Sequence, residues 1–155
     1  MENNLNNPEI INDLIKINND RIAGYKTALD LAHGLGLDML RHIFANNILQ
    51  SERFIDELTP FVLREGEQPT DETMLSGKLF RMWMSIKVNI AGNDRKSLLE
   101  SCEKGEDAFK ETYKKTLEDD DNNLSIDLNN ILLNQLDNQI EAHNEIKNLR
   151  DNASL

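Results

Sequence analysis

The sequence is poor in residues that constrain a chain covalently or rigidly. It holds one cysteine, Cys102, and three prolines among 155 residues. A single cysteine excludes an internal disulfide and any zinc cluster built from cysteines. Basic side chains are outnumbered, with 17 Lys and Arg against 28 Asp and Glu, so the formal net charge is -11. Nucleic acid and anionic membrane surfaces are therefore not expected as partners, because both are usually bound by basic faces.

Long apolar runs are also missing. None reaches the roughly 18 residues that a membrane-spanning helix needs. Residues 1–7 lack the basic region and apolar core of a signal peptide, and we expect them to form a flexible N-terminus. Residues 8–152 are enough for a single domain with a buried core. The bacterial cytoplasm is the simplest location.

Helical periodicity is present along almost the whole chain, whereas the alternating pattern of β-strands is absent. A helix start is indicated where Asn7 precedes Pro8 and Glu9, as a cap, a first-turn proline and a first-turn acid. Pro60 predicts a kink or an end late in the second helix, with 61–63 as a last turn. The predicted helices span about 8–33, 37–63, 70–91, 94–118 and 125–152.

Four of these helices are long, and the third is shorter. The sequence therefore predicts an all-α fold, a ferritin-like four-helix bundle. The shorter extra helix lies in the long crossover between the second and third bundle helices.

A carboxylate interrupts the apolar face of the helix predicted over 94–118. Glu106 shares that face with Cys102, Phe109 and Tyr113 at spacings of three and four. A buried carboxylate without partners is costly, so Glu106 needs hydrogen bonds or a metal ion. The other long helices carry mid-helix interruptions at Asn18, Asn47, Ser51, Gln135 and Gln139.

Mid-helix positions of antiparallel neighbours meet at similar height, so these six residues predict a central polar layer. We expect Glu106 to accept hydrogen bonds from Gln139, Asn47 or Tyr25. Such a layer would fix the register of the helices, as buried asparagines do in coiled coils.

A metal centre is the alternative interpretation. A ferritin-like di-iron site needs a glutamate from each of two helices and Glu-x-x-His from the other two, and the chain contains no Glu-x-x-His. Iron or another divalent metal could still be held by Glu52, Glu103, Glu106 and His143, although their spacing matches no recognised motif. Cys102 is interpreted as a core residue, because no histidine lies near it in the sequence.

Several segments together resemble a known family. In order they are Asp20 with Gly24-Tyr25, Ser51-Glu-Arg-Phe54, Gly77 with Arg81-Met-Trp-Met-Ser-Ile-Lys87, Cys102-Glu-Lys-Gly-Glu-Asp107 with Tyr113, and Gln135 with His143, Ile146 and Leu149. Over about residues 9–150 the chain is similar to a bacterial family of ferritin-like four-helix-bundle proteins known only as a domain of unknown function.

The resemblance implies the ferritin-like fold and no assigned activity. Proteins of the wider superfamily bind iron or act in stress responses, which is analogy only. Members of the family often carry a glutamate two residues before the Gly-Tyr pair, where this chain has Ile22. A first-helix carboxylate that could bind metal is therefore missing.

Three hypotheses of function follow. The first is a non-enzymatic bundle protein, stress-related and without a cofactor, that associates as a homo-dimer or larger oligomer. Its interface would be formed by Phe80, Met82, Trp83 and Met84, which exceed what one bundle face can cover. The second is a metal-binding ferritin-like oxidoreductase or iron handler using Glu106 with Glu103, Glu52 or His143. The third is a small-molecule pocket lined by Met74, Met82, Met84 and Tyr25. No catalytic residues are assigned, so the sequence leans towards a protein that is not an enzyme.

Overall fold

The computed structural model describes residues 7–74, 81–83, 85 and 94–152, and within these it contains helices and no strands. The all-helical prediction is therefore confirmed for the described part of the chain. The elements are α1 (Pro8–Gly34), α2 (Asp38–Arg64), α4 (Asp94–Glu118), the short 3-10 helix η2 (Asp120–Asn122) and α5 (Ile126–Asn152).

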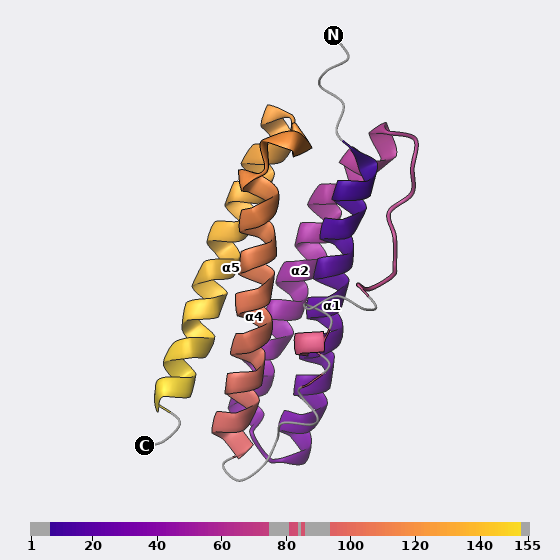
Figure 1. Cartoon of the computed structure of the whole chain (residues 1–155). Coiled ribbons are helices and arrows are strands. Elements are labelled where there is room, and N and C mark those ends of the chain that lie inside the picture. The colour runs from indigo at the N-terminus through magenta and orange to yellow at the C-terminus, as the bar shows by residue number, and fades with distance from the viewer. Residues whose placement is uncertain (1–6, 75–80, 84, 86–93, 153–155) are drawn as a thin grey trace.

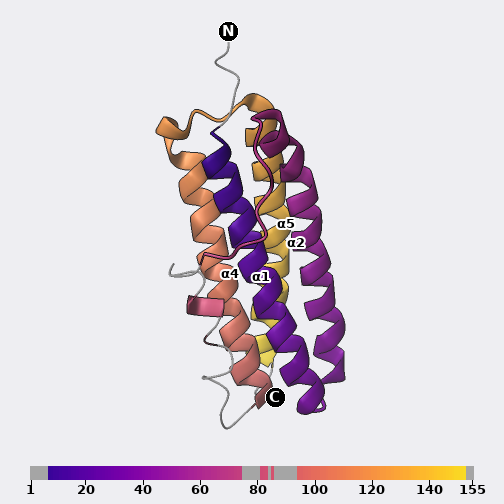
Figure 2. The ribbon, with the colours of Figure 1, turned by 90° about the vertical axis from the view of Figure 1, so that its right-hand side faces the viewer.

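The four long helices lie side by side as a bundle (Figure 1). α1 runs away from the end at which the N-terminus lies, α2 returns, α4 runs in the same direction as α2, and α5 runs back. α1 packs on α2 and α4, while α5 packs on α4 and α2. All four packed pairs are therefore antiparallel, and the middle parts of the four helices lie at similar height (Figure 2).

The predicted start of α1 is present in the structure. The side chain of Asn7 accepts a hydrogen bond from the Glu9 backbone N–H at 2.8 Å, and Pro8 occupies the first turn. α1 ends at Gly34, and Gly36 takes a left-handed φ of 74° in the turn that follows. Pro60 does not end α2, which continues to Arg64 and includes the expected last turn.

The helix predicted from Thr70 does not begin there. Residues 70–74 are irregular, and 81–83 are helical, while 75–80, 84 and 86–93 lie outside the described residues. Side chains of α1 hold this segment instead. Asn12 donates to the Gln68 carbonyl at 3.2 Å, and Asn19 donates to the Glu72 carbonyl at 2.9 Å. The Glu72 carbonyl, which a helix from Thr70 would pair internally, is thus satisfied by α1.

Trp83 is part of the core. Its exposed fraction is 0%, and its ring lies 5.1 Å from the Tyr25 ring, between centroids. The ring also lies against two helical glycines, Gly24 of α1 and Gly105 of α4. A Cβ atom at these positions would come within 2.4 Å and 2.6 Å of the indole. The expectation that Trp83 belongs to an exposed interface is therefore wrong, because the two glycines leave room for it inside. Met82 is half-buried, while Phe80 and Met84 lie outside the described residues.

Candidate functional site

A buried ion pair stands at the centre of the bundle. Arg21 of α1 donates from Nε to Oε1 of Glu106 on α4 and from Nη2 to Oε2, each at 2.9 Å. Both side chains have an exposed fraction of 0%. Paired geometry of this kind joins a guanidinium and a carboxylate by two parallel hydrogen bonds and is among the stronger polar contacts in proteins. Glu106 therefore has a cationic partner from a neighbouring helix.

Three further side chains form hydrogen bonds with this pair. The Tyr25 hydroxyl donates to Oε2 of Glu106 at 2.5 Å. Gln139 of α5 donates from Nε2 to Oε1 of Glu106 and to the Glu106 backbone carbonyl, both at 3.0 Å. Nη1 of Arg21 donates to the Ser51 hydroxyl of α2 at 3.1 Å. All four long helices thus contribute to one hydrogen-bonded cluster, which we call the Arg21–Glu106 cluster (Arg21, Tyr25, Ser51, Glu106 and Gln139).

A second polar chain lies beside this cluster. Asn18 donates to the Tyr113 hydroxyl at 2.9 Å, and that hydroxyl donates to Oε1 of Gln135 at 2.7 Å. Gln135 in turn donates to the Phe54 backbone carbonyl at 3.2 Å and to Glu57 at 2.9 Å. Asn18 and Gln135 of the predicted layer therefore belong to a hydrogen-bonded group separate from the Arg21–Glu106 cluster.

All six residues of the predicted layer are buried: Asn18, Asn47, Ser51, Glu106, Gln135 and Gln139. Of the three donors expected for Glu106, Tyr25 and Gln139 fill that role. Nδ2 of Asn47 is buried and has no partner among the described residues. The main partner, Arg21, was not expected, although its position three residues after Asn18 and four before Tyr25 places it on the same helical face.

The electrostatics of the centre favour fixed protonation states. Burial lowers the pKa of Arg21, but the charge and hydrogen bonds of Glu106 together with the nearby Tyr25 and Tyr113 more than offset this, and the pKa is raised overall. Burial and the Glu106 carboxylate raise the pKa of Tyr25 well above its usual value. The same two causes raise the pKa of Cys102. Tyr25 is therefore a neutral donor and Cys102 a neutral thiol, which is unsuited to nucleophilic chemistry.

The four residues of the metal alternative are not gathered at one place. Among the described residues, the group that could hold an ion consists of Glu103, Asp107 and His143, whose ligand atoms lie within 4.8 Å of one another. Glu106 and Glu52 are not members of it. Glu106 is directed into the bundle, where Arg21 binds both its carboxylate oxygens, and Glu52 is exposed on α2.

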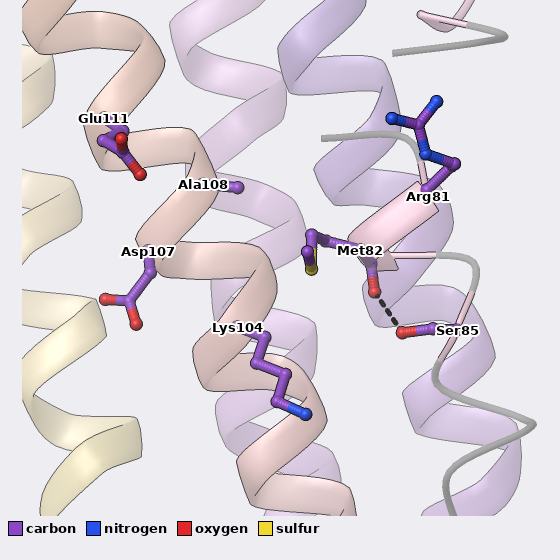
Figure 3. A pocket seen from close by; sticks show the side chains of 7 residues that line it. All are labelled: Arg81, Met82, Ser85, Lys104, Asp107, Ala108 and Glu111. Carbon is purple, nitrogen blue, oxygen red and sulfur yellow. Dashed lines mark hydrogen bonds between the residues drawn. The ribbon is translucent and has the colours of Figure 1, made fainter. Parts of the chain in front are cut away.

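A surface pocket of about 510 Å³ lies between α4 and the described part of the connection (Figure 3). Its lining includes Met82, Ser85 and Arg81 opposite Lys104 and Ala108 of α4. Of the described members of the expected small-molecule pocket, Met82 lines it, and Met84 lies outside the described residues. Tyr25, by contrast, is fully buried in the Arg21–Glu106 cluster.

Comparison with known proteins assigns a family. The fold and the site define the chain as an all-helical bundle with a buried polar centre. The chain belongs to the family described as "Domain of unknown function (DUF2383)", whose model matches residues 8–119. The resemblance to a family of unknown function is thus confirmed over α1, α2 and α4, and the match does not reach α5. No curated protein and no solved structure matches the chain. Within the part of the chain that the structure describes, no helix is both long and apolar enough to cross a membrane.

Proposed function

We propose that this chain is a non-enzymatic, ferritin-like bundle protein whose centre is an ion-paired polar cluster in place of a di-iron site. The helix directions support the ferritin-like arrangement, because two antiparallel pairs, α1 with α2 and α4 with α5, are joined by one long connection. The observation that carries the proposal is the contact of Arg21 with both carboxylate oxygens of Glu106.

That contact leaves little for a metal ion to bind. A di-iron centre needs several carboxylates to balance the charge of two cations. Glu106 already accepts two hydrogen bonds from Arg21 and further ones from Tyr25 and Gln139. The groups that α2 and α5 add to the cluster, Ser51 and Gln139, are neutral. Iron ions at this point would meet the fixed positive charge of Arg21 at close range, which is strongly unfavourable in a buried site.

Iron oxidation tests the proposal. Ferrous iron is added anaerobically to the full-length protein and oxygen is then admitted, and the absorbance of ferric products is followed against buffer alone. We expect no near-ultraviolet band of an oxo-bridged iron pair, and no acceleration of oxidation in the double variant Asp107→Asn, His143→Gln. Iron oxidation that is accelerated in the Asp107→Asn, His143→Gln double variant and lost in Glu106→Gln would contradict the proposal. The double variant serves as the background because it removes the surface group of potential ligands.

Self-association is a separate part of the proposal, and burial of Trp83 removes one of the four residues of the interface that the sequence suggested. Six large apolar side chains stay at least a third exposed on the described surface: Leu35, Met39, Leu49, Leu63, Ile126 and Leu133. Single exposed apolar residues are common on monomers as well. Sedimentation velocity over a hundredfold range of concentration decides between a monomer and a dimer. A role in stress responses and a cytoplasmic location stay predictions.

A further inference from the structure

We propose that Glu103, Asp107 and His143 form a binding site for one divalent transition-metal ion, with Zn²⁺ as the best-suited example. The site lies outside the bundle core at the seam between α4 and α5. It goes beyond the proposed function, because it uses neither Glu106 nor the interior of the bundle.

The helical register explains why these three side chains meet. Glu103 and Asp107 are four residues apart on α4 and so share one face. His143 comes from the antiparallel α5, four residues after Gln139, which is hydrogen-bonded to Glu106. The buried contact between Gln139 and Glu106 thus places His143 level with Glu103, within reach of Asp107. Asp107 also lines the pocket drawn in Figure 3, where its carboxylate points away from Met82 and Ser85.

The distances suit a small cation. The potential ligand atoms all lie within 4.8 Å of one another, and Nε2 of His143 lies 2.5 Å from Oδ1 of Asp107. A tetrahedral zinc ion with bonds of about 2.0–2.2 Å holds its ligand atoms roughly 3.5 Å apart. Binding therefore requires only modest rotation of the two carboxylates. Two carboxylates with one imidazole suit zinc, ferrous iron or manganese, and three protein ligands leave a coordination position open to water.

The surroundings orient the histidine. The side chain of His143 is 8% exposed, whereas that of Asp107 is 53% exposed, so the ion would be anchored in the seam and reached from solvent. Nδ1 of His143 lies 3.3 Å from Oδ1 of Asn144. With the proton on Nδ1, this contact becomes a hydrogen bond and leaves the lone pair of Nε2 facing the carboxylates. Metal-binding histidines are usually held by such an outer hydrogen bond.

Arg150 competes with the ion for Glu103. It donates from Nη1 to Oε1 of Glu103, and it also donates to Oδ1 of Asp151 from Nη2 at 2.7 Å and from Nε at 3.2 Å. Arg150 therefore has a second anionic partner and can release Glu103 when a cation enters. Removal of this competitor should strengthen metal binding. If Arg150 and Glu103 formed only a structural salt bridge with no metal site beside it, substitution of Arg150 would not strengthen zinc binding.

The experiment is a zinc titration of the full-length, tag-free protein after treatment with chelator, followed by isothermal titration calorimetry. We expect one Zn²⁺ per chain. Asp107→Asn and His143→Gln should each weaken binding at least tenfold, and Arg150→Gln should strengthen it several-fold. Matched controls are Glu111→Gln, one turn further along α4, and His42→Gln on α2, both exposed, and neither should change the affinity. Co²⁺ in place of Zn²⁺ should give the visible absorption of a four- or five-coordinate ion.

Three results would overturn the site. They are no saturable binding, binding weakened equally by the controls, and binding unchanged in Asp107→Asn. Circular dichroism checks that each variant is folded. If His143→Gln does not fold, the zinc affinity of Asp107→Asn still tests the site, because Asp107 is half-exposed. An ion that survives Asp107→Asn and His143→Gln but is lost in Glu106→Gln would overturn the proposed function as well. Loss of the surface site alone leaves the proposed function standing.

Discussion

Arg21 of α1 and Glu106 of α4 are joined by two hydrogen bonds of 2.9 Å while both side chains are fully excluded from solvent. The pair fixes the height of α1 against α4. Through Ser51 and Gln139 it also reaches α2 and α5. This one buried contact therefore helps to fix the relative heights of all four long helices.

Breaking this pair should be costly. Glu106→Leu leaves the guanidinium of Arg21 buried without a counter-charge, so we expect the free energy of unfolding to fall by about 3–5 kcal/mol. This exceeds the roughly 1–3 kcal/mol expected if Glu106 had only neutral donors. Urea unfolding followed by circular dichroism measures the change, with exposed Glu111→Gln as the control, expected within about 0.5 kcal/mol of wild type.

The double variant Arg21→Met, Glu106→Leu removes both charges together. It should be more stable than the sum of the two single losses predicts, because neither charge is left alone. Additive losses would show that the two residues are not coupled.

The two glycines that receive Trp83 should be intolerant of alanine. A Cβ atom at Gly24 or Gly105 would lie within 2.4 Å or 2.6 Å of the indole, so the ring or a helix must move. We expect a loss of about 1–3 kcal/mol, larger than the gain in helix propensity that alanine brings. Gly34→Ala is the matched control, since nothing lies within 4 Å of its added Cβ.

Fluorescence also reports whether the indole of Trp83 is displaced in these variants, because Trp83 is the only tryptophan in the sequence. Displacement from the core should shift its emission to longer wavelength in Gly105→Ala and leave it unchanged in Gly34→Ala. An unshifted spectrum with full stability in both Gly24→Ala and Gly105→Ala would place the indole elsewhere.

Asp20 should make stability depend on pH. Its carboxylate is buried and accepts from the Met74 backbone N–H at 3.2 Å and 3.3 Å. Burial raises the pKa of Asp20 from 3.8 to about 6, although the Met74 hydrogen bond acts in the opposite direction. A raised pKa in the folded state means that the unfolded chain releases the proton first as pH rises. The stabilisation is therefore complete below pH 3.8 and is lost as pH rises through about 6.

Asp20→Asn keeps an acceptor for Met74 but cannot titrate. Between pH 4 and pH 6.5 the wild-type protein should lose more unfolding free energy than the variant, by at most about 3 kcal/mol. Urea denaturation at a series of pH values measures both curves. Parallel curves would mean that Asp20 titrates alike in the folded and unfolded chains.

Much of the fold was accessible from the sequence because its signals are local. The cap at Asn7, the apolar periodicity and the turns predicted four long helices with bounds close to those observed. The burial of Glu106 followed from its position on an apolar face, and Tyr25 and Gln139 were correctly expected as its donors.

The failures concern contacts between segments distant in the chain. Arg21 shares the inward helical face of Asn18 and Tyr25, but its partner is identified only once α4 places the Glu106 carboxylate opposite it. Trp83 suggested an exposed interface because periodicity gives no sign that Gly24 and Gly105 open a space for it, although glycines inside two helices were a hint. The segment at Thr70 has a helix-start pattern, yet Asn12 and Asn19 bind its backbone in another conformation.

The most direct test of the central claim is anomalous diffraction at the iron edge from crystals soaked in ferrous iron without oxygen. The Arg21–Glu106 cluster predicts no anomalous peak within coordination distance of Glu106 and an intact Arg21 contact. An ion at Glu103, Asp107 and His143 is compatible with that result. Two adjacent peaks bound to the Glu106 carboxylate, with the Arg21 guanidinium displaced, would contradict it.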